Sequence, residues 1–196
     1  MKKLWTLVAA TGMAGLILAG CGGAQKDAKE KADSANNSVD SLSKVQPNNK
    51  MAVSGPDADF AVEAANGGMG EVELGRLAEQ KATNADVEAF GAMMVADHSK
   101  INGQMKKIAA AKNITLPDSV GSDVKKMETD LAAKSGADFD KAYVDEMVKD
   151  HKEDISAFEE AAKKVTYPEL QDFISSNLPV LRKHLDAIQK IQTKMK

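Results

Sequence analysis

The chain has a single cysteine, three histidines and few aromatic residues, which make up 4% of the sequence. One cysteine excludes a disulfide framework, CxxC redox chemistry and a zinc site built from several thiolates. No segment has the glycine-rich pattern of a phosphate loop or a dinucleotide fold, and none has the GxSxG or HExxH pattern of common hydrolases. The sequence therefore argues against the enzyme classes that are easiest to identify from a motif.

Acidic residues outnumber basic residues in this chain. The chain has 26 basic and 29 acidic residues, a formal net charge of −3. Without Lys2 and Lys3, which precede a predicted cleavage site, 24 basic and 29 acidic residues remain, a net charge of −5. No basic cluster is interleaved with aromatic residues. We therefore expect no nucleic-acid binding.

The N-terminus carries the one long apolar run, from Leu4 to Leu18. Two lysines precede the run, which is too short to span a bilayer as a stable helix. It ends in LAGC at residues 18–21, which matches the bacterial lipobox, where cleavage precedes the cysteine and lipid is attached to it. The sequence predicts a lipoprotein signal peptide over residues 1–20 and a lipid anchor on Cys21. An ordinary secretory signal with an incidental cysteine is the alternative.

The residues that follow the cysteine set the expected location. In bacterial lipoproteins, which this N-terminus resembles, a residue other than aspartate after the cysteine favours the outer membrane, and here that residue is Gly22. We therefore expect a lipid-anchored envelope protein that faces the periplasm. Residues 21–56 are rich in Gly, Ser, Asn, Lys and Asp, and they cannot bury enough apolar surface to offset chain entropy. This stretch is predicted to be a flexible tether, with a docking segment that folds on an envelope protein partner as the alternative.

The remaining residues, 57–196, are about the size of one domain. Their apolar residues recur with helical spacing, and no run alternates with a period of two. Four long apolar stripes lie within residues 60–78, 87–108, 144–165 and 170–191, and a shorter helix is expected over 122–134. We therefore predict an all-α domain, an up-and-down four-helix bundle with one extra short helix.

Each long stripe carries one ionisable residue on its apolar side: Glu71, His98, His151 and His184. Such buried groups must be neutral, be paired or bind a metal. Imidazole and carboxylate ligands suit zinc, copper or iron, whereas calcium and magnesium prefer oxygen alone. The four residues are predicted to hold one transition metal ion, with a hydrogen-bonded core cluster as the alternative. The axial level of each side chain decides between the two, and periodicity does not supply it.

Two near-copies of one segment, MMVADH and EMVKDH, surround two of the histidines: Met94, Asp97 and His98 in the first, Met147, Asp150 and His151 in the second. We expect the two aspartates to orient histidine rings of neighbouring helices, unless they are solvated acids on a helix flank. The two methionines stand one turn before the histidines, where they would suit copper(I) or serve only as core. A duplicated helical hairpin would explain the repeat without any function.

A bacterial family called domain of unknown function 4142 resembles this chain over about residues 57–192. The resemblance is carried by GGMGEVELGRLAEQKATNADVEAFGAMMVADHSKINGQMKKIAAAKNITLP, FDKAYVDEMVKDHKEDISAFEEAAKK and LPVLRKHLDAI. It implies a ferritin-like four-helix bundle exported to the outer membrane or periplasm, and it supplies no established reaction. Ferritin-like di-iron sites place a glutamate three residues before each ligand histidine. Here those positions hold Val95, Val148 and Leu181, so we expect a mononuclear site.

Three functional hypotheses follow from the sequence. A metal-binding envelope lipoprotein requires the four inward groups to lie at one level of the bundle. A non-metal envelope lipoprotein that acts as a protein-interaction or stress-related module requires separated histidines and an exposed apolar patch. A ferritin-like enzyme requires an accessible cleft that reaches the histidines, and the sequence identifies no catalytic residue for it. The oligomeric state is not determined by the sequence.

Overall fold

The computed structural model describes residues 26–45 and 55–195, and the secondary structure of this part of the chain is entirely helical. It contains six helices: α1 (Ala28–Val45), α2 (Gly55–Lys81), α3 (Ala85–Lys112), α4 (Ser122–Ala132), α5 (Gly136–Ala161) and α6 (Pro168–Lys194). The prediction of an all-α fold is confirmed. No helix in the described ranges is both long and apolar enough to cross a membrane. The predicted signal peptide and Cys21 lie outside these ranges.

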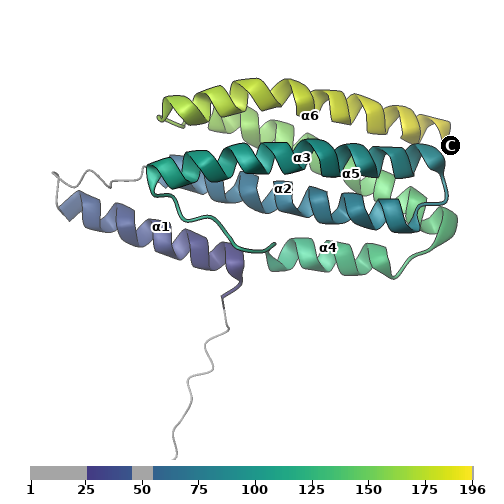
Figure 1. Cartoon of the computed structure of the whole chain (residues 1–196), viewed down its shortest axis with the longest axis horizontal. Helices are drawn as coiled ribbons and strands as arrows, with labels where there is room; N and C mark the ends of the chain where they lie inside the picture. The colour runs from purple at the N-terminus through teal and green to yellow at the C-terminus, as the bar shows by residue number, and fades with distance from the viewer. Residues whose placement is uncertain (1–25, 46–54, 196) are drawn as a thin grey trace, which may run out of the picture.

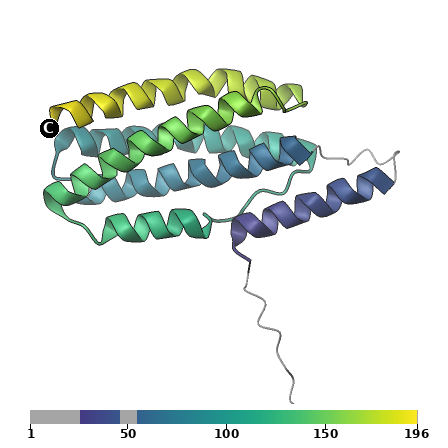
Figure 2. The same ribbon diagram turned by 180° about the vertical axis from the view of Figure 1, so that it is seen from behind.

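Four long helices, α2, α3, α5 and α6, pack side by side around one interior (Figures 1 and 2). The hairpins α2–α3 and α5–α6 pack together through α2 against α5 and α3 against α6. The connection that contains α4 carries the chain back along the bundle (Figure 1). As a result α3 and α5 run in the same direction, whereas consecutive helices alternate in a simple up-and-down order.

Two buried aspartates tie the ends of the hairpins together. The Asp57 carboxylate in α2 accepts hydrogen bonds from the backbone N–H and hydroxyl of Thr166, just before α6, at 2.8 and 2.7 Å. The Asp140 carboxylate in α5 accepts from the backbone N–H and hydroxyl of Thr83, just before α3, at 3.1 and 2.5 Å. Both the aspartates and the threonines are 83 positions apart. The two hairpins are therefore equivalent, with helix α2 matching α5 and helix α3 matching α6.

The apolar core consists of two clusters, one toward each end of the bundle. One contains Phe60, Phe158 and Phe173, and the other contains Phe90 and Tyr143. On α3, α5 and α6 a histidine stands between residues of the first cluster and residues of the second, and on α2 Glu71 does so. The four predicted inward groups therefore lie at one level of the bundle.

Helices α2 and α3 approach each other closely. A Cβ atom at Gly75 would lie 2.8 Å from the Gly91 carbonyl oxygen, and a Cβ at Gly91 would lie 2.7 Å from the Gly75 carbonyl oxygen. Only glycine fits at such a contact between two backbones. The contact brings Glu71, one turn before Gly75, within reach of the side chains of α3.

Helix α3, which carries an Asp-His pair of the repeat, has a defined start and end. The side chain of Asn84 accepts a hydrogen bond from the Asp86 N–H at 2.9 Å and caps the first turn. Asn113 ends the helix in the left-handed conformation, with φ of 57°, and its N–H bonds back to Ala109. These two caps set the residues at which α3 begins and ends.

The predicted tether over residues 21–56 differs from the structure, because Ala28–Val45 within it forms α1, which packs against α2. Polar contacts attach this helix. The Asn36 side chain donates to the Thr115 carbonyl oxygen at 2.9 Å and accepts from the Thr115 N–H at 2.8 Å. Lys29 pairs with Glu63 at 2.9 Å. Composition gave no sign of this helix because its attachment depends on specific hydrogen bonds more than on a broad apolar face.

Candidate metal centre

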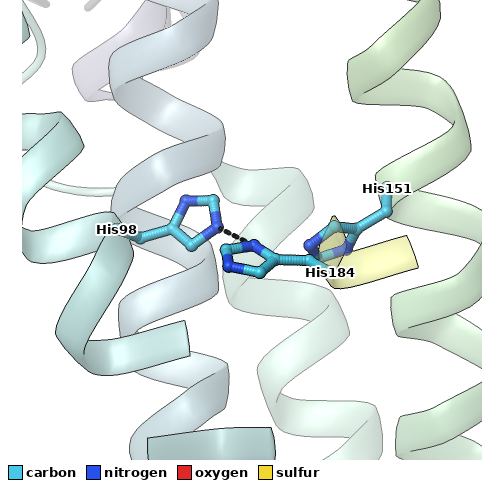
Figure 3. Close-up of side chains that lie close together, drawn as sticks. All are labelled: His98, His151 and His184. Carbon is cyan, nitrogen blue, oxygen red and sulfur yellow. Dashed lines mark hydrogen bonds between the residues drawn. The ribbon is translucent and has the colours of Figure 1, made fainter. Parts of the chain in front are cut away.

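Three histidine rings from three helices meet in the interior (Figure 3). His98 comes from α3, His151 from α5 and His184 from α6, and each residue is at most 1% exposed. The ring centroids are 5.3, 5.6 and 6.0 Å apart. One ring nitrogen from each histidine lies within 4.8 Å of one from each of the others. The shared axial level that the metal hypothesis required is therefore present.

The spacing of two of these nitrogens suits a tetrahedral ion. His98 Nε2 and His184 Nδ1 are 3.3 Å apart, the contact drawn in Figure 3. Zinc–nitrogen bonds of about 2.0–2.1 Å at tetrahedral angles separate two donor nitrogens by about 3.3 Å. The pair is thus already at the separation that a shared metal ion needs.

The other nitrogen of each ring is held by an oxygen atom of the protein. The three contacts are His98 Nδ1 with Glu71 Oε2 at 2.5 Å, His184 Nε2 with Asp97 Oδ2 at 3.2 Å, and His151 Nδ1 with the Met147 carbonyl oxygen at 3.0 Å. Metal-binding histidines have this arrangement, in which a carboxylate or carbonyl oxygen fixes the ring and leaves the second nitrogen for the ion. Asp97 on α3 thus contacts the ring of a histidine on a neighbouring helix.

Glu71, which the sequence predicts as a direct metal ligand, joins the cluster through one of its oxygens as the partner of the His98 ring. The residue is 2% exposed, and its Oε1 atom lies 3.5 Å from His151 Nε2. Neither of these two atoms has a hydrogen-bond partner within the described chain. Buried polar atoms are nearly always paired, and these two atoms face each other at a distance that lets them share one ligand.

Burial keeps the histidines neutral. It lowers the pKa of His98 and His184 to about 4 and that of His151 to about 3. Neutral imidazole is the form that binds metal, so the rings are in the binding form at pH 7. Burial, together with the charge of Asp150, raises the pKa of Glu71 well above its usual range, while a hydrogen bond with Asp154 opposes the rise.

The sequence predicts one inward carboxylate, Glu71, and the structure places two half-buried aspartates of α5, Asp150 and Asp154, beside the cluster as well. Asp150 offers an oxygen within 4.8 Å of ligand atoms of Glu71 and His151. Asp154 lies one helical turn further along α5, and its pKa is raised well above the usual range by burial and by the charges of Glu71 and Asp150. Its position, three residues after His151, could have identified it, because residues at that spacing share a helix face.

The side chains of the two methionines of the repeat pack in the apolar core. Met94 and Met147 are fully buried within the apolar cluster that contains Phe90 and Tyr143. Met147 contributes its backbone carbonyl oxygen to the His151 ring instead. Their packing is that of core residues that fill irregular space.

One small cavity reaches the cluster. It has a volume of about 20 Å³ and is lined by Glu71, His98 and Asp154 together with apolar side chains and the backbone of Gly67 and Gly68. A volume of this size holds about one water molecule. The cavity is therefore too small to admit an organic substrate to the histidines.

The repeated Asp-His segments are not equivalent in the fold. His98 lies on the second helix of the first hairpin, and His151 lies on the first helix of the second hairpin. At the 83-residue spacing that relates the hairpins, His98 corresponds to Leu181 and His151 corresponds to Gly68. Duplication of a hairpin therefore does not explain why both segments carry a histidine at the same level of the bundle.

The chain was also compared with known proteins. No curated protein and no solved structure matches it. One family model matches residues 42–191, which include α2 to α5, most of α6 and all of the residues of the cluster. The chain therefore belongs to the family described as "Domain of unknown function (DUF4142)".

Proposed function

We propose that the protein is a membrane-tethered helical-bundle protein of the bacterial cell envelope that binds one transition metal ion through His98, His151 and His184. The observation that carries the proposal is the orientation of the rings. Each ring has one nitrogen held by a protein oxygen, and the three rings turn toward one another. Three neutral, buried imidazoles with fixed second nitrogens form a donor set for a metal ion.

The donor set defines the class of metal. Three imidazole nitrogens suit zinc, copper(II) or iron(II), and they leave a fourth position for water or for Glu71 Oε1. The unpaired Oε1 atom supports this assignment because it lies 3.5 Å from His151 Nε2. The burial of Met94 and Met147 in the apolar core argues against a copper(I) site with thioether ligands.

The small cavity supports a role in binding over a role in catalysis. Its volume of about 20 Å³ admits water or a bare ion to the histidines. A protein with such a site is suited to buffering or sensing a transition metal. Because the ion is enclosed by four helices, its release requires the helices to move apart, and the exchange of metal should be slow.

The location outside the cytoplasm is part of the proposal and rests on the sequence. The apolar run and the lipobox at residues 18–21 support export and a lipid on Cys21. The acidic balance and the shortage of basic clusters fit an envelope protein without nucleic-acid partners. We place the bundle at the outer membrane, facing the periplasm.

The alternative, a protein-interaction or stress-related module without metal, has less support. It requires separated histidines and an exposed apolar patch. The histidines lie together, and among residues whose side chains are described, Leu42 is the large hydrophobic residue that stands out as exposed, at 62%. A single exposed leucine is normal on a protein surface.

Elemental analysis of the full-length protein tests the proposal. The protein would be purified without chelator and compared with His98→Ala and His151→Ala. We expect close to one metal ion per chain in the wild type and a loss of metal in both variants. Asn177→Ala is the matched control, because Asn177 is a buried polar residue of α6 whose hydrogen bonds go to Gln104 and Phe173. Wild-type protein that stays free of metal after exposure to zinc, copper and iron would refute the proposal.

A further inference from the structure

The small cavity beside the histidines has an outer end and an inner end. Three of its lining residues are partly exposed, and all three lie on α2 or α5: Ala64, Gly67 and Asp154. The other lining residues are buried, and they include His98 and Glu71. The cavity therefore extends from the seam between α2 and α5 inward to the histidine cluster.

Gly67 and Asp154 form the mouth of this cavity. A Cβ atom at Gly67 would lie 3.7 Å from Asp154 Oδ1, so the two residues face each other across the seam. The Asp154 carboxyl group in turn interacts with that of Glu71, whose Oε2 contacts the His98 ring at Nδ1. Carboxyl oxygens thus lead from the mouth to a candidate metal ligand, along a cavity whose other walls are apolar side chains and glycine backbone.

Two other seams of the bundle are closed at the level of the histidines. Between α2 and α3, the Asn102 side chain occupies the place that a Cβ atom would take at Gly68. Between α3 and α6, Asp97 contacts the His184 ring at 3.2 Å. The seam between α2 and α5 is where the packing leaves space beside the cluster.

The size of the cavity determines the state in which an ion can pass. Its volume of about 20 Å³ holds about one water molecule. A divalent ion in water carries a shell of several water molecules, so most of the shell must be lost at the mouth. A carboxylate oxygen at that point can take the place of a departing water molecule, because carboxylates bind divalent ions readily.

We propose that the ion enters and leaves the histidine site through the seam between α2 and α5, where Asp154 replaces water on the passing ion and Gly67 keeps the mouth open. A group that contacts the ion only during passage lowers the barrier in both directions. It therefore speeds entry and release by the same factor and leaves the affinity unchanged. The inference rests on the proposed function, because the passage has a role only if the histidines bind an ion.

Metal exchange by the full-length protein in detergent tests this route. The protein would be loaded with one Zn²⁺ per chain and mixed with an excess of a chromogenic chelator. The rate of release is the rate at which the absorbance of the chelator complex grows, at chelator concentrations where this rate is constant. Equilibrium competition with the same chelator gives Kd, and the ratio of the release rate to Kd gives the rate of entry.

Two variants change the mouth without touching a histidine. Asp154→Asn removes the carboxylate and keeps the shape of the side chain. Gly67→Ala narrows the mouth, and its Cβ atom fits without strain because 3.7 Å is an ordinary van der Waals contact. We expect each variant to slow release by about tenfold, with Kd changed by less than about twofold.

Each variant has a matched control. Glu153→Gln removes a charge from the next position of α5, where the side chain is 65% exposed. Gly103→Ala replaces a helix glycine at a position where a Cβ atom meets nothing within 4 Å. Gly103→Ala therefore reports the effect of a stiffer helix alone. Both controls should exchange Zn²⁺ at the wild-type rate.

The outcomes separate the route from the site. Release at the wild-type rate in Asp154→Asn and Gly67→Ala, or equal slowing in the two controls, would overturn the route and leave the histidine site intact. A change in release that is matched by the change in Kd would also overturn it, because Asp154 would then act on the bound ion. Wild-type protein that binds no Zn²⁺ at equilibrium would overturn the histidine site for zinc and the route with it.

Discussion

Asp97 on α3 holds the ring of His184 on α6, with its Oδ2 atom 3.2 Å from the ring Nε2. The contact crosses between two helices that belong to different hairpins. It fixes the ring so that Nδ1 faces His98 Nε2 at 3.3 Å. Although burial pushes the pKa of Asp97 upward, the hydrogen bonds from His184 and Lys100 lower it overall, so Asp97 is ionised and accepts from the ring.

Replacing Asp97 should therefore weaken metal binding without unfolding the protein. We expect Asp97→Ala to reduce the affinity for Zn²⁺ by about 10- to 100-fold, because the His184 ring loses its orientation and its basicity. Competition with a chromogenic chelator measures the change. Lys100→Ala is the control, since Lys100 contacts the other oxygen of Asp97 from an exposed position. An equal loss of affinity in Lys100→Ala would mean that charge on the helix surface, and not ring orientation, is responsible.

The aspartate that ties α5 to the start of α3 should contribute strongly to stability. Asp140→Ala leaves the N–H groups of Thr83 and Asn84 and the Thr83 hydroxyl without their acceptor. We expect the free energy of unfolding to fall by about 2–3 kcal/mol, measured by urea denaturation. Asp138→Ala, an exposed position in the same turn of α5, should change it by less than about 0.5 kcal/mol. Similar losses in the two variants would contradict the role of Asp140 as a buried cap.

Two glycines of α3 should respond in opposite ways to alanine. Gly91→Ala places a Cβ atom 2.7 Å from the Gly75 carbonyl oxygen, so α2 and α3 must move apart. We expect a loss of about 1–3 kcal/mol in stability. At Gly103 a Cβ would meet nothing within 4 Å, so Gly103→Ala should stabilise the helix by up to about 1 kcal/mol. Thermal melting followed by circular dichroism distinguishes the signs, and a stabilising Gly91→Ala would refute the close contact.

Acid should release the start of α1 through Asp27. Its carboxylate accepts from the N–H of Glu30 and from that of Ser122, and these hydrogen bonds lower its pKa from 3.8 to about 2. A carboxyl group with a depressed folded pKa contributes stability that is present above about pH 4 and is lost as the pH falls through 2. We expect amide protection at Glu30 and Ser122 to decrease over this interval.

Hydrogen exchange followed by NMR or mass spectrometry measures this effect. In Asp27→Asn the side chain has no charge to lose, so protection at the start of α1 should be weaker at neutral pH. It should also change less between pH 4 and pH 2. A decrease in protection of the same size in the variant would assign the acid response to other carboxylates.

The sequence was sufficient for much of the local structure and for the choice of candidate residues. The helical spacing of apolar residues predicted four long helices and one short helix close to their observed positions, because each amphipathic helix must bury one stripe. The same spacing placed Glu71 and the three histidines on the buried side, since the direction of a side chain around a helix follows from its register alone. The shortage of other motifs left these residues as the main candidates.

The tertiary structure decided which side chains of different helices lie next to one another. Axial levels depend on helix caps and interhelical contacts such as Asn84, Asp140 and Gly91, and a hydrophobic period contains no information about them. Asp150 lies next to His151 on the flank of α5, away from the apolar stripe, and this flank is partly buried because α5 contacts α2, α4 and α6. The attachment of α1 depends on a hydrogen-bond pair between Asn36 and Thr115, 79 residues apart, which no local pattern encodes. Sequence thus determined which way the side chains point, and the packing of the helices determined which of them meet.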